Sequence, residues 1–97
     1  MKSVQKIVTS SNTPLVIPLN ERGGPVGIGA TPAGAGDYTI EITLTPQNEG
    51  LTNNTFPITD MTAATTAQQV ELGPASAIIV TLNSGTSVTV DITQSDV

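Results

Sequence analysis

Glu41 and Asp91 are the acidic residues whose positions come nearest to a catalytic pattern. Each stands among alternating apolar and polar residues, so both are expected to project from the polar faces of strands and to lie near each other if those strands pair. A glycosidase needs two carboxyl groups about 5 to 10 Å apart in a cleft, which aromatic residues usually line. Because Tyr38 and Phe56 are the only aromatic residues, the sequence favours two solvated carboxylates over a catalytic pair.

Other catalytic arrangements lack essential residues. The chain contains no histidine and no cysteine, which excludes Ser–His and Cys–His pairs, disulfides, and the ligands that zinc prefers. The glycine-rich segment Gly23–Ala30 is not a phosphate loop, because Pro32 stands where the dinucleotide motif needs glycine and no lysine follows Lys6. The sequence therefore predicts no catalytic residues, no metal site and no cofactor.

A group of oxygen-bearing side chains near the middle of the chain is a candidate for a calcium site. It consists of Asn48, Glu49, Asn53, Asn54 and Asp60. Carboxylate and amide oxygens suit Ca²⁺, but the spacing does not match an EF-hand loop. Asn and Asp are also common in ordinary turns, which is the favoured interpretation. Cation binding by the loop from Asn48 to Asp60 stays open.

The charge distribution argues against a nucleic-acid partner. Eight carboxylates and three basic side chains give a net charge of −5, and the basic residues, Lys2, Lys6 and Arg22, all lie in the first quarter of the chain. Phosphate contacts need clustered Lys or Arg. No apolar run is long enough to span a membrane or to form the centre of a signal peptide. We therefore expect neither nucleic acid nor a membrane among the partners.

Short segments of alternating polarity predict an all-β chain. Tyr38–Thr45 is the clearest, with Tyr38, Ile40, Ile42 and Leu44 expected on its apolar face. The others are Val4–Thr9, Thr13–Leu19, Val26–Ala30, Thr55–Ile58, Gln68–Leu72, Ala77–Leu82 and Ser87–Thr93. Seven to eight short antiparallel strands predict a single-domain β-sandwich, jelly-roll-like, over residues 1–97. Prolines place the second segment at a sheet edge or bend it, and residues 1–19 are expected to form an edge or arm segment.

The segment Ala75–Thr93 predicts a β-hairpin, since two apolar runs flank Asn83-Ser84-Gly85-Thr86. Val88, Val90 and Ile92 share the core face of the second run. In the first run Ala77 and Ile79 lie opposite the core face, where a strand buried on one side would usually carry polar residues. Burial on both faces or a subunit contact would explain them. The candidate subunit contacts are Leu15, Ile17, Ala77 and Ile79.

Three segments follow one another in an order known from another group of proteins: Pro18–Arg22, Gly36–Thr43 and Gly73–Val90. Their arrangement resembles small structural proteins of tailed bacteriophages that decorate or cement the capsid. The resemblance implies a β-sandwich or jelly roll that forms a homo-oligomer, either a trimer or a dimer. It also implies synthesis in the host cytoplasm, a place on the capsid surface of the virion, and binding to the major capsid protein. No catalytic residues are implied.

The expected function is therefore that of a non-enzymatic virion structural protein, which stabilises the capsid by contacts across subunit boundaries. The alternative is a receptor- or carbohydrate-binding β-module of a phage tail or fibre. A third interpretation is a bacterial surface or pilus-like β-subunit. An enzyme is the least favoured.

Overall fold

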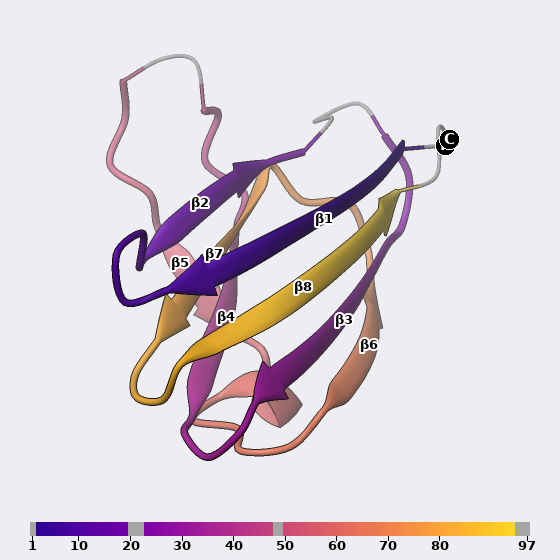
Figure 1. Ribbon diagram of the computed structural model, residues 1–97. Coiled ribbons are helices and arrows are strands. Elements are labelled where there is room, and N and C mark those ends of the chain that lie inside the picture. The colour runs from indigo at the N-terminus through magenta and orange to yellow at the C-terminus, as the bar shows by residue number, and fades with distance from the viewer. Residues whose placement is uncertain (1, 20–22, 48–49, 95–97) are drawn as a thin grey trace.

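The computed structural model describes residues 2–19, 23–47 and 50–94, which form eight strands in two antiparallel sheets (Figure 1). The strands are β1 (Lys2–Thr9), β2 (Leu15–Pro18), β3 (Val26–Ala33), β4 (Tyr38–Thr43), β5 (Thr55–Pro57), β6 (Gln68–Leu72), β7 (Ala77–Leu82) and β8 (Ser87–Gln94). One turn of 3₁₀ helix, η1 (Thr59–Met61), precedes β6. No helix among the described residues is long and apolar enough to cross a membrane.

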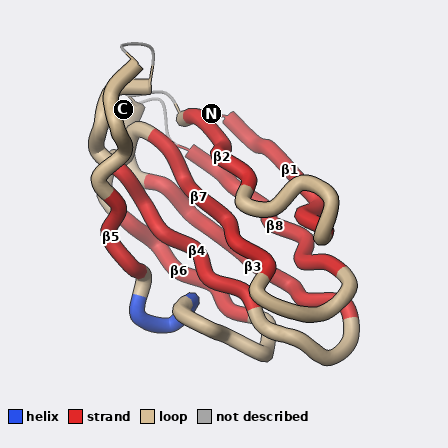
Figure 2. Tube along the Cα trace, turned by 90° about the vertical axis from the view of Figure 1, so that its left-hand side faces the viewer, coloured by secondary structure: helices blue, strands red, loops and turns tan. Residues whose placement is uncertain are grey.

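The strands pair as nested antiparallel partners. β1 pairs with β8, β2 with β7, β3 with β6, and β4 with β5. The resulting strand orders are β1-β8-β3-β6, here called the β1 sheet, and β2-β7-β4-β5, here called the β2 sheet. Figure 2 looks onto the β2 sheet with the β1 sheet behind it. This order is that of a jelly roll, so the predicted all-β sandwich is confirmed.

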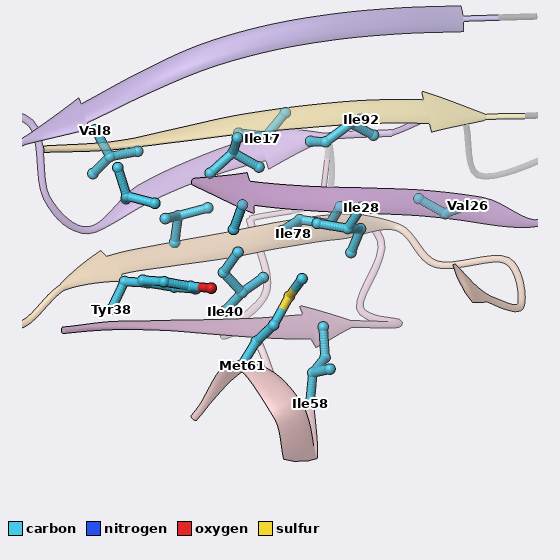
Figure 3. Close-up of a cluster of buried hydrophobic side chains, with 14 of the residues drawn as sticks. Val8, Ile17, Val26, Ile28, Tyr38, Ile40, Ile58, Met61, Ile78 and Ile92 are labelled. Atoms are coloured by element: carbon cyan, nitrogen blue, oxygen red, sulfur yellow. The ribbon is translucent and has the colours of Figure 1, made fainter. Parts of the chain in front are cut away.

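The core consists of apolar side chains from the inner faces of both sheets (Figure 3). The β1 sheet contributes Val88, Val90 and Ile92, each no more than 2% exposed, which confirms the core face expected for the last strand. Ile78 and Val80 of β7 face them from the β2 sheet. Aliphatic residues thus supply most of the buried volume, as the scarcity of aromatic residues requires.

The predicted hairpin of Ala75–Thr93 is wrong. β7 pairs with β2 and β4, whereas β8 pairs with β1 and β3, so the two strands belong to different sheets. The apolar runs do face one core, but from opposite sides of it. Alternating polarity reports which face of a strand is buried, and it does not report which strand is its neighbour.

The expected place of Leu44 on the core face is also wrong. β4 ends at Thr43, whose side chain is fully buried, and Leu44 is 58% exposed. The Thr45 backbone N–H donates a hydrogen bond of 3.1 Å to Oγ1 of Thr43. Ile42 still packs against the core, as predicted. The local bond turns the chain out of the strand after Thr43, so the alternation ends before Leu44.

Two connections that cross between the sheets lie in direct contact. The backbone N–H groups of Asn83 and Ser84 both donate to the Asp37 carbonyl, at 2.9 and 3.2 Å. The Ser84 hydroxyl donates to Oδ1 of Asp37 at 2.5 Å. Gly36 and Gly85 lie between these bonds, where a Cβ on either one would overlap the backbone of the other connection. The segment before β4 is therefore held in place by the segment before β8.

We expect Gly36→Ala to destabilise the fold by more than about 1 kcal/mol, because Gly36 has a φ of +139° and no room for a methyl group. Gly73→Ala is the matched control, since a Cβ there meets nothing within 4 Å. Chemical denaturation of both variants measures the difference. Equal midpoints for the two variants would show that the contact between the crossing connections is not tight.

Tyr38 gives a prediction about alkaline stability. Its buried hydroxyl donates a 2.8 Å hydrogen bond to the Thr66 carbonyl, and burial raises its pKa above the ordinary value of 10.0. The folded state therefore holds the proton more tightly than the unfolded state. This contribution to stability is complete below about pH 10 and is lost as the pH rises toward the folded pKa.

We expect Tyr38→Phe to cost about 1 kcal/mol at neutral pH through loss of the hydrogen bond. Above about pH 10 the variant should lose less stability per pH unit than the wild type. Thermal unfolding between pH 7 and 11 provides the measurement. Parallel curves for the two proteins would contradict the assignment.

Candidate functional site

The structure separates the four predicted subunit contacts into two pairs. Leu15 and Ile17 stand opposite Val80 and Ile78 of β7, so they face the core. Ile17 is 3% exposed and Leu15 packs half-buried against the core. Little of either side chain is left to meet another subunit.

Ala77 and Ile79 lie on the outer face of the β2 sheet, as predicted. Ala77 is fully buried, and Ile79 is half-buried between Val16 of β2 and Glu41 of β4. The exposed apolar residue of β2 is therefore Val16, at 41%, and not Leu15 or Ile17. The outer face has an apolar centre, and the role of Ile79 in a subunit contact stays a prediction.

A second apolar surface lies on β5 and on the connection between β4 and β5, which extends beyond the strand ends (Figure 1). Leu44, Leu51 and Phe56 are 58%, 58% and 49% exposed, and together they line a hollow of about 350 Å³. We call these three residues the loop patch. The sequence interpretation missed it, because Leu44 was expected in the core and the rest of the connection is polar. The isolated Leu51 within that polar connection was the available signal.

Hydrogen bonds hold the base of this connection together. The Gln47 side-chain amide donates to the Thr45 carbonyl at 2.8 Å and to Oδ1 of Asn53 at 2.9 Å. The Asn54 N–H donates to the Thr45 hydroxyl at 3.1 Å. The two sides of the connection are therefore tied to each other next to the loop patch.

A groove of about 530 Å³ crosses the outer face of the β1 sheet. Gly27 and Gly29 of β3 form its floor. One wall is formed by Asp91 and Thr93 of β8, and the other by side chains of β6 that include Glu71. We call it the glycine groove. Because glycine has no side chain, this face of β3 is bare between the two walls.

The structure does not bring Glu41 and Asp91 together. Glu41 lies on the outer face of the β2 sheet, whereas Asp91 lies on the outer face of the β1 sheet and accepts a 2.7 Å hydrogen bond from the Gln5 amide. The whole sandwich separates the two carboxyl groups. The prospect that their strands pair is wrong, because β4 and β8 belong to different sheets.

The candidate calcium loop is only partly described. Asn48 and Glu49 lie outside the described residues, and Oδ1 of Asn53 already accepts the bond from Gln47. Among the residues that are described, no three acidic, histidine or cysteine side chains form a group that could hold a metal ion.

Comparison with known proteins yields one structural likeness. No protein-family model and no curated protein match the sequence. The fold is similar to a solved chain from the disulfide-linked pili of Bacillus endospore appendages, with a TM-score of 0.56 and 14% sequence identity. The match covers 99% of this chain and 86% of the pilus chain. At this identity the likeness concerns the fold.

We expect Ile79→Asp to lower stability by about 1 kcal/mol, because it places a carboxylate directly across from Glu41. Ile79→Thr, which keeps a β-branched side chain, is the control. Chemical denaturation measures folding and sedimentation velocity measures assembly. If Ile79→Asp leaves both unchanged, the outer face of the β2 sheet is merely exposed.

Proposed function

We propose that the protein is a non-enzymatic structural subunit that acts by packing against other subunits in a multi-copy assembly. The loop patch carries this proposal. Five large apolar side chains are exposed among the described residues, and three of them share one hollow: Leu44, Leu51 and Phe56. Burying such a side chain stabilises a contact by about 1.5 to 3 kcal/mol. A contiguous apolar surface of this kind is typical of a protein–protein contact site.

The first candidate assembly is a phage capsid that the protein decorates or cements. The order of the three segments from Pro18 to Val90 supports it, as does a jelly-roll body with apolar surface at the loop patch. The proposed partner is the major capsid protein, and the proposed location is the outside of the virion. Many copies, each binding the closed shell, would raise the free energy needed to open it.

The second candidate is a fibre built from copies of this chain. It is supported by the likeness to the Bacillus pilus chain over nearly all of the present sequence. Those pili are disulfide-linked, whereas this chain has no cysteine, so disulfides could not join its copies. Contacts between copies would have to be non-covalent, and the loop patch is a surface that could supply them.

Substitutions in the loop patch test the proposal. Leu51→Ser and Phe56→Ser should each weaken assembly about tenfold or more, because each removes an apolar side chain from the proposed contact. Ala33→Ser is the control for placing a serine at an exposed position, since Ala33 is exposed at the end of β3 and lies outside the patch. Thermal unfolding confirms that all three variants remain folded.

Two assays separate the candidate assemblies. Sedimentation and electron microscopy of the purified protein detect oligomers and fibres. Heads from a phage that lacks the gene, mixed with purified protein, report capsid binding and recovered heat resistance. Binding to heads supports the capsid candidate, and fibres of the protein alone support the second. Patch variants that match the wild type in both assays would refute the role of the loop patch, and a wild type that neither binds heads nor associates would refute the proposal.

A further inference from the structure

Gly29 has no structural reason within its own chain to be glycine. It lies inside β3, paired on both sides, its φ is not positive, and a Cβ added to it meets nothing within 4 Å. Its neighbour Gly27 differs, because a Cβ there would approach the Thr93 hydroxyl to 2.9 Å. Glycine inside a strand costs about 0.5 to 1 kcal/mol relative to alanine. A bare strand at Gly29 is therefore explained better by something that approaches it from outside.

The glycine groove has the width of one extended polypeptide. Neighbouring strands are about 4.8 Å apart, so the walls on β8 and β6 stand about 10 Å from each other. The backbone of β3 is paired with both neighbours, so the floor offers contact but few free hydrogen-bonding groups. Polar recognition must come from the walls, where the Gln69 amide and the Thr93 hydroxyl can bond to peptide groups.

The charge of the walls selects a cation. Asp91 and Glu71 line the groove, and none of the residues lining it is basic. The basic residues of the chain stand at positions 2, 6 and 22, and Lys6 is exposed with no carboxylate partner among the described residues. Lys6 lies on β1, an edge strand whose outer backbone groups have no strand to pair with in the described chain. β1 therefore combines free peptide groups with a positive charge.

We propose that the glycine groove binds β1 of a second copy of this chain, with Lys6 directed to the carboxylates of Asp91 and Glu71. This inference rests on the proposed function and names the partner for one of its contacts. A copy cannot fill its own groove, because β8 stands between its β1 and its β3. A lysine on the inward side of an edge strand hinders pairing of two sheet edges. The same lysine does not hinder the contact proposed here, in which the edge strand of one copy lies on the outer sheet face of another copy.

Filling the groove tests the contact without weakening the fold. Gly29→Leu should fold at least as stably as the wild type, since leucine suits a strand and has open space there. It should weaken self-association about tenfold or more. Gly73→Leu is the matched control, because Gly73 has equally open space and lies outside the groove. Sedimentation velocity over a range of protein and salt concentrations measures both, and added salt should weaken the wild-type contact.

Charge reversal tests which residues meet. Two variants are compared: Lys6→Glu, and the double variant Glu71→Lys, Asp91→Lys. In each, the affinity of self-association should fall about tenfold or more. Mixing these two proteins pairs a negative β1 with a positive groove, and this should restore a complex. Three results would each overturn the inference. These are a wild type that stays monomeric, a Gly29→Leu variant that associates normally, and charge-reversed proteins that form no complex with each other.

The two proposals fail separately. If the groove variants assemble normally while Leu51→Ser and Phe56→Ser do not, the groove contact is absent and the proposed function stands. If the patch variants assemble normally while the groove variants do not, the loop patch loses its role and the groove contact remains.

Discussion

The close passage of two chain connections, at Gly36 and Gly85, is the constraint on which the rest of this jelly roll depends. The links from β3 to β4 and from β7 to β8 both cross between the sheets, and they meet in space. Two glycines let the backbones approach, and Asp37 bonds across the contact. β4 begins directly after one of these connections and β8 directly after the other, and the two strands belong to different sheets. A shift of the contact would therefore displace a strand in each sheet at the same time.

The closed core leaves the outer faces and the loops as the places where function can reside. Aliphatic side chains from both sheets fill the interior. Glu41 and Asp91, the two carboxylates considered as a catalytic pair, lie on the outer faces of opposite sheets. The outer faces and the loops are therefore the surfaces on which the proposed packing contacts would form.

The two proposed contact surfaces differ in chemistry as well as in place. The loop patch is apolar and extends from the end of the β2 sheet, whereas the glycine groove carries the carboxylates of Glu71 and Asp91 and lies open on the face of the β1 sheet. Because they differ in chemistry and lie on separate parts of the chain, the two surfaces could contact two different neighbours at the same time. Repeated contacts that join different surfaces build rings or open chains, which are the forms that shells and fibres require.

Local patterning in the sequence was sufficient for the all-β class, the core face of Val88, Val90 and Ile92, and the edge position of the proline-bearing β2, because alternation and missing N–H groups act within a strand. It could not place β7 and β8 in separate sheets, end β4 before Leu44, or gather Leu51 with Phe56. Strand partners are chosen by the path of the whole chain between the sheets, and exposure depends on what that path brings alongside. Only the tertiary structure decides the sheets of β7 and β8, since their partner strands are far apart in sequence and meet only when the sandwich closes. The end of β4 and the grouping of Leu51 with Phe56 depend on how the backbone turns after Thr43, which alternating polarity does not report.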